Sequence, residues 1–144
     1  MAVDPVVARR EALVAILEPA ARTVIDRVVE EAVRAAHIFG LTRDRADRYA
    51  AGINATLPLV FDAMKMPDGP DRQRVIGDLA TAVRAVSDTN HIPRIVERGL
   101  VAIAVRIARE MVRRGAVARN FTPEELETEF VAFADRLEDR LFSE

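Results

Sequence analysis

The stretch HIPRIVERGLVAIAVRIAREMVRRG, residues 91–115, contains the most apolar run of the chain and decides the fold class. Pro93 is suited to the start of a helix, and Gly115 is suited to its end. Every residue from Leu100 to Val105 is apolar, so a helix here would present apolar side chains on nearly every side. Such a helix is buried on several faces. We therefore expect a buried central helix over about residues 93–114.

The rest of the chain repeats its apolar residues at spacings of three and four, and no run alternates apolar and polar residues as a strand would. Asp4, Thr42 and Thr122 are suited to cap helix starts. Pro19 and Pro58 each predict a kink or a break. We expect one all-α domain over residues 1–144, a bundle of about five to seven helices.

The charge pattern suggests how two of these helices pair. The segment 94–119 is rich in arginine, and the segment after Glu124 is rich in acids. Neighbouring antiparallel helices with complementary solvated faces explain this asymmetry.

Composition narrows the classes of function. The 144 residues carry a formal net charge of -2, which argues against a general nucleic-acid binder because such proteins are usually basic. The chain has no cysteine, and therefore no disulfide or thiolate site. The first residues lack the continuous apolar core of a signal peptide, so we expect a cytoplasmic protein. Its longest apolar run, residues 99–105, is far shorter than the roughly 20 residues that span a membrane.

Few side chains point to catalysis or metal binding. No glutamate has a histidine three residues later, as a di-iron bundle requires. Ser87 and Ser143 lie at a predicted helix end and near the chain terminus. An enzyme would rest on His91 as a base, with Asp88 one turn away, and on nothing else. We interpret His91 as a loop residue beside Pro93, and His37 as a residue in the last turn of a helix. We therefore expect no enzyme activity, no metal site and no cofactor.

One segment has features of a DNA-binding unit. Ala51-Gly52-Ile53 fits the turn of a helix-turn-helix motif, which keeps a TetR-like helical DNA-binding regulator as an alternative. Asp47 and Arg48 stand where such a unit buries apolar residues, and Pro58 would interrupt its recognition helix. These features make DNA binding by this segment the less favoured interpretation.

Three segments in the middle of the chain carry a family likeness: NATLPLVF at 54–61, LATAVRA at 79–85 and HIPRIVERGL at 91–100. Over roughly residues 24–115 the chain resembles the helical N-terminal sensor domain of PucR/CdaR-type regulators and, more distantly, RsbR-type stressosome proteins. Those domains resemble globins without haem. The resemblance implies a globin-like fold and a regulatory or signalling role. The family's DNA-binding or STAS module has no counterpart here, and His91 stands where the family has a glycine.

A globin-like fold raises the question of haem. In a globin the iron-binding histidine lies inside a helix, about one turn before a corner. His91 lies at the predicted corner itself, His37 lies at a helix end, and Tyr49 belongs to an apolar stripe. We therefore expect no haem ligand.

Two hypotheses of function remain from different classes. The first is a non-catalytic regulatory domain that acts by homodimerisation or by binding a protein partner or effector domain, with Val7, Leu13, Leu17, Phe130 and Phe133 as the candidate interface. The second is a sensor of a small apolar ligand. Its candidate pocket consists of Gly99, Ala102, Ile103 and Ala104, because small side chains on a buried helix leave room for a ligand or for a close helix.

Overall fold

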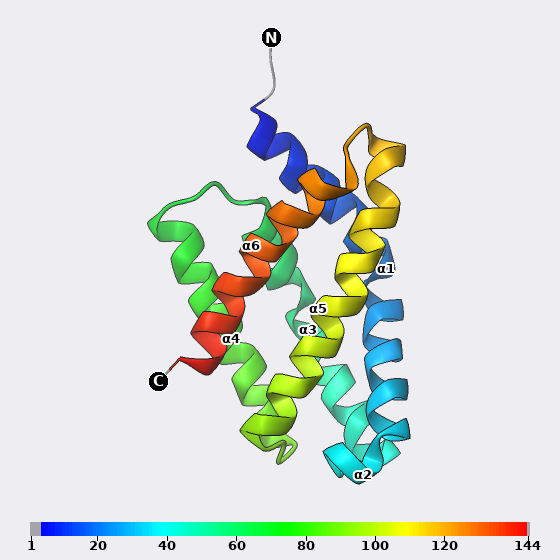
Figure 1. Cartoon of the computed structure of the whole chain (residues 1–144). Helices are drawn as coiled ribbons and strands as arrows, with labels where there is room; N and C mark the ends of the chain where they lie inside the picture. The colour runs from blue at the N-terminus through cyan, green and yellow to red at the C-terminus, as the bar shows by residue number, and fades with distance from the viewer. Residues whose placement is uncertain (1–3, 144) are drawn as a thin grey trace.

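A computed structural model describes residues 4–143, and over this range the chain forms six α-helices, one short 3-10 turn and no strand (Figure 1). The all-α fold class is thus confirmed. None of these helices is both long enough and apolar enough to cross a membrane. The elements are α1 Pro5–Arg34, α2 Ala36–Phe39, α3 Arg43–Lys65, α4 Pro70–Thr89, α5 Arg94–Ala116, η1 Val117–Arg119 and α6 Pro123–Phe142.

The three predicted caps are present. The carboxylate of Asp4 accepts a hydrogen bond from the backbone N–H of Val6 at 2.8 Å, and Pro5 is the first residue of α1. The Thr42 and Thr122 hydroxyls each accept from the backbone N–H three residues later, at 3.2 Å in both cases. Each cap satisfies a backbone donor that the first turn of a helix leaves without a partner.

Both internal prolines lie inside continuous helices. Pro19 is in the middle of α1, and Figure 1 shows this helix as two segments that run in different directions. Pro58 likewise lies inside the continuous α3, so the prediction of a break is wrong at both prolines. Because α3 is continuous, Ala51-Gly52-Ile53 lies within a helix. The turn that a helix-turn-helix unit requires is therefore absent from this segment.

Two predicted helix ends need correction. The apolar spacing from Ala21 to Ala36 predicts one long helix that ends at Gly40. Gly40, with φ of 68°, instead ends the short α2, because α1 already ends at Arg34. Gly115 does not end α5; it lies in the last turn, where an added Cβ would stand 2.9 Å from Ile16 Cγ1. The chain reverses instead at Asn120, which has a φ of 64°. Gly115 is therefore a packing position that lets α5 approach α1 closely.

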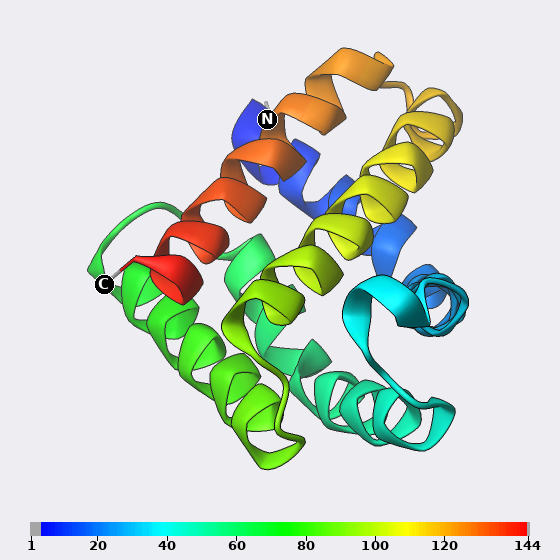
Figure 2. The same cartoon turned by 60° about the horizontal axis from the view of Figure 1, so that its bottom comes forward.

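Five of the helices form a closed ring. α1 packs against α3 and α5, α3 packs against α4, and α6 closes the ring by packing against both α4 and α5. Figure 2 shows this arrangement, with α6 and α5 crossing the upper part of the view and α4 and α3 below them. The predicted pairing of charged faces is confirmed at α5 and α6, where Arg109 Nη2 lies 2.6 Å from Glu127 Oε1 and Arg113 contacts the same carboxylate.

The interior has two apolar clusters. The first includes Leu13 and Leu17 of α1 and Phe130 and Phe133 of α6, together with residues of α4. The second surrounds Leu100 of α5. The expectation that the run 100–105 is buried on several faces is wrong. Leu100 is buried, but Ala102 is exposed and the other four residues are half-buried. The reason is that α5 lies in the wall of the ring and not at its centre.

Candidate ligand-binding cavity

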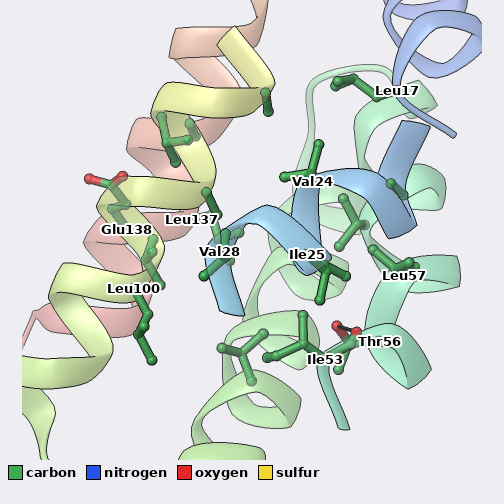
Figure 3. A pocket seen from close by; sticks show the side chains of 18 of the residues that line it. Leu17, Val24, Ile25, Val28, Ile53, Thr56, Leu57, Leu100, Leu137 and Glu138 are labelled. Atoms are coloured by element: carbon green, nitrogen blue, oxygen red, sulfur yellow. Dashed lines mark hydrogen bonds between the residues drawn. The ribbon is translucent and has the colours of Figure 1, made fainter. Parts of the chain in front are cut away.

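The centre of the ring is hollow. A cavity of about 210 Å³ lies between α1 and α3 on one side and α5 and α6 on the other (Figure 3). Its walls are mostly aliphatic side chains, with two phenylalanines from α6 and one from α3. The residues that line the cavity include Val24, Ile25, Val28, Ile53, Leu57, Val60, Phe61, Leu100, Val101, Ala104, Val105, Ala108, Phe130, Phe133 and Leu137.

The cavity wall is almost entirely apolar. Among the residues that line it, polar side-chain atoms occur in Tyr49, Thr56 and Glu138 alone. The Thr56 hydroxyl already donates to the carbonyl of Ile53 in its own helix at 2.7 Å. Figure 3 shows the Glu138 carboxylate turned away from the apolar side chains. Water in such a cavity would find few hydrogen-bond partners, and cavities of this kind favour apolar molecules.

Small side chains on opposite walls explain why the ring leaves this space. Ala50 lies on α3, Ala104 and Ala108 lie on α5, and all three line the cavity. Several of the side chains in this wall, among them Val101 and Val105, are half-buried. Apolar surface in contact with water costs roughly 25 cal/mol per Å². An apolar occupant that covers this wall would therefore stabilise the folded chain.

The four residues of the predicted pocket do not lie together. Ala104 lines the cavity. Ile103 is half-buried against the second apolar cluster, and Ala102 is exposed. Gly99 faces another helix, because a Cβ added there would lie 2.7 Å from Phe39 Cε1. The small residue at 99 thus permits close packing, whereas the one at 104 borders the cavity.

The predicted dimer interface needs correction. Leu13, Leu17, Phe130 and Phe133 are at most 5% exposed and belong to the first apolar cluster. Val7 is 38% exposed and is the one residue of the predicted five that reaches the surface. The stripes on α1 and α6 face each other and α4 within one chain, so these four residues cannot contact a second copy.

A polar cluster lies next to the cavity where α3, α4 and α5 converge. Glu97 and Ser87 are each 1% exposed. Arg84 Nε donates to Glu97 Oε1 at 3.2 Å, whereas Glu97 Oε2 has no hydrogen-bond partner among the described residues. Burial, together with the nearby Glu97 charge, raises the pKa of Tyr49 to about 12, and a hydrogen bond with the Ser87 hydroxyl partly opposes this. A buried carboxylate oxygen without a partner is unusual in a folded protein.

None of the predictions from the sequence included this cluster, although the residue pattern carried a signal. Ser87 follows Val83 by four residues, and Glu97 precedes Leu100 by three. Val83 and Leu100 both line the cavity. Polar residues at these spacings therefore continue apolar stripes, and a polar residue in such a stripe is a candidate for a buried functional group.

Both histidines lie outside the cavity wall. His91 is exposed in the turn after α4, with a φ of 55°, and its predicted place in a loop is confirmed. His37 is exposed in α2 beside Gly40. Over residues 4–143, no three histidine, aspartate or glutamate side chains gather as a metal site would require.

An outer groove borders the cavity at the two internal prolines. Pro19 and Pro58 both line this groove, and its rim is charged. It shares three residues with the cavity wall, namely Ala21, Leu57 and Phe61. Those side chains are thus the partition between the cavity and the solvent on this side.

Comparison of the chain with protein family models, with curated proteins and with solved structures gave no significant match. The resemblance to PucR/CdaR-type and RsbR-type sensor domains therefore stays a prediction.

Proposed function

We propose that this chain is a non-catalytic regulatory domain that binds a small apolar molecule inside its helical ring. The observation that carries the proposal is the cavity of about 210 Å³ with an almost wholly apolar wall. An engineered apolar cavity of about 150 Å³ is large enough to bind benzene. A short alkyl chain or a single ring is therefore the class of ligand that matches this space.

Binding would also stabilise the fold. A ligand that binds the folded state alone raises stability in proportion to the logarithm of its concentration relative to Kd. In this ring, an occupant would give the half-buried wall of α5 contacts that it lacks. The ligand concentration would then set the proportions of a less stable empty state and a more stable filled state. A sensor requires such a shift in populations.

The composition of the wall supports binding in preference to turnover. The cavity-lining residues include no histidine and no lysine, and the hydroxyl of Thr56 donates to its own helix. Nucleophilic catalysis needs a nucleophile beside a base, and these lining residues provide no such pair.

The proposal is tested by titrating isotope-labelled protein with 1-hexanol and following methyl resonances by NMR. We expect the largest shifts at Val24, Ile53 and Leu100, which line the cavity, and none at the exposed Ile95 and Val117. Shifts that are largest at the exposed methyls, or no saturable shift at all, would contradict the proposal.

A second candidate function is self-association, favoured by two large apolar side chains on the surface. Ile38 is 69% exposed and Ile95 is 82% exposed. Each lies within about one turn of the contact between Phe39 and Gly99. A dimer through this region would bury about 800 Å² per partner. Light scattering tests this candidate: a dimer at micromolar concentration that Ile95→Arg converts to monomer supports it, and a monomeric wild type contradicts it.

A further inference from the structure

We infer that the outer groove between α1 and α3 binds the zwitterion of a free α-amino acid with an apolar side chain. Residues of both helices line this groove. The inference goes beyond the proposed function, because it assigns a charged ligand to the outside of the ring. It stands whether or not the central cavity holds an apolar molecule.

The rim of the groove carries both signs of charge. α1 contributes Glu18 and Arg22, and α3 contributes Asp62 and Lys65. All four side chains are exposed, and none of them forms an ion pair within residues 4–143. In each helix the acid and the base are one turn apart, so their Cβ atoms lie about 5–6 Å from each other. The groove thus presents two neighbouring pairs of opposite charges.

A backbone carbonyl adds a further hydrogen-bond acceptor. Pro58 has no N–H, so the carbonyl of Asn54, four residues earlier in α3, does not receive the hydrogen bond that an α-helix otherwise provides. Asn54 and Pro58 both line the groove, and in a helix this carbonyl points from the first toward the second. Asp62 is one turn further along the same face of α3. An N–H donor in the groove is therefore offered a backbone oxygen as well as a carboxylate.

The remaining lining of the groove is mostly apolar. Pro19 and Ala21 of α1 contribute to it, and so do Leu57, Pro58 and Phe61 of α3. An apolar side chain that covers these residues removes its own surface and theirs from water.

Charge selects a zwitterion. A ligand with a single charge would be attracted by one member of each pair and repelled by the other, and a neutral apolar molecule would make no use of the charges. An α-amino acid carries an ammonium and a carboxylate on one carbon atom and matches both signs. Its ammonium would donate to the Asn54 carbonyl and to Glu18 or Asp62, and its carboxylate would accept from Arg22 or Lys65.

L-leucine and three analogues, each of which lacks one part of it, test the inference. 4-Methylpentanoate lacks the ammonium, 3-methylbutylamine lacks the carboxylate, and glycine lacks the apolar side chain. The groove is open and solvent screens its charges, so we expect binding in about the millimolar range, which NMR titration measures. L-leucine should shift the methyl resonances of Leu57, which lines the groove, and not those of Leu100, which lines the cavity alone. Each analogue should bind at least about fivefold more weakly.

Two double variants remove the charges of one sign. Glu18→Gln with Asp62→Asn removes the acids, and Arg22→Gln with Lys65→Gln removes the bases. Each should weaken L-leucine at least about fivefold, because one charged group of the ligand loses its partner. Asp26→Asn is the matched control: Asp26 is an exposed acid of α1 that does not line the groove, and its replacement should leave the affinity unchanged. All the replaced side chains are exposed, and circular dichroism verifies that each variant folds.

Three outcomes would overturn the inference. The first is equal affinity of the wild type for L-leucine and for either analogue that lacks a charge. The second is an affinity for L-leucine that survives either double variant. The third is the absence of any saturable shift at Leu57, or a larger shift at Leu100. The 1-hexanol titration tests the cavity separately, so its failure would contradict the proposed function and not the amino-acid site.

Discussion

Arg10 Nε donates to Glu129 Oε1 at 2.6 Å and thereby joins the start of α1 to α6, 119 residues later. The Arg10 side chain is 6% exposed and that of Glu129 is 16% exposed. The same guanidinium donates to the carbonyl of Met66 at 2.6 Å and to Asp68 at 3.1 Å. One buried cation thus connects α1, α6 and the loop before α4, at one end of the ring.

Replacement of Arg10 should be costly. Arg10→Met keeps much of the apolar stem but leaves Glu129 as a largely buried charge without its main partner. We expect the free energy of unfolding to fall by about 3 kcal/mol in urea denaturation. Arg9→Met is the matched control: Arg9 lies 3.9 Å from the other oxygen of Glu129 and is more exposed, so its loss should cost less than about 1 kcal/mol. Equal costs for the two variants would show that Arg10 is not the structural cation.

Two helical glycines should respond oppositely to alanine. A Cβ at Gly52 in α3 would lie 2.5 Å from Val86 Cγ1 in α4, and a valine side chain has little freedom to move. The clash should outweigh the gain in helix propensity, so Gly52→Ala should destabilise the fold by about 1–2 kcal/mol.

Gly77→Ala is the comparison for this substitution. The Cβ would meet the guanidinium end of Arg140, an exposed and flexible side chain that can turn into solvent. Removal of a helical glycine should then stabilise the fold by about 0.5–1 kcal/mol. Thermal unfolding followed by circular dichroism measures both variants. A destabilised Gly77→Ala, or a neutral Gly52→Ala, would contradict the helix packing described here.

Ionisation of Glu138 makes the stability of the fold depend on pH. Burial, and then the nearby Asp135 and Asp139, raise its pKa above the ordinary value of 4.5, with Arg98 acting in the opposite direction. The folded state thus binds this proton more strongly than the unfolded state does. Its contribution favours the fold below pH 4.5 and is lost as the pH rises through the raised pKa.

Glu138→Gln should therefore stabilise the protein at pH 7 and not at pH 4. The gain should be less than about 1 kcal/mol, because the side chain is half-exposed and solvent screens its charge. Urea denaturation of both proteins at the two pH values measures the difference. An equal gain in the free energy of unfolding at both pH values would show that the effect does not come from ionisation of Glu138.

Local chemistry made much of the fold predictable. The hydroxyls of Thr42 and Thr122 cap the helices expected of them, because a cap depends on residues within one turn. The proline at position 58 was harder to interpret, because its sequence neighbours do not show whether the helix continues through it. Here α3 does continue through Pro58, and it packs against both α1 and α4.

The site could be predicted only in part. Ala102 and Ala104 are indistinguishable by composition, and the rotation of α5 decides which of them borders the cavity. Leu13 and Phe130 illustrate a second limit. An apolar helical stripe looks the same in sequence whether it faces the core or another chain, and here it faces the core.

The most direct test of the central claim fills the cavity from within. Ala104→Leu adds bulk to a residue that lines the cavity, and Ala102→Leu makes the same change two residues away on the exposed face of α5. Isothermal titration calorimetry with 1-hexanol compares the two. The account predicts that Ala104→Leu weakens binding at least about tenfold and that Ala102→Leu leaves it unchanged. Equal affinities of the two folded variants would contradict it.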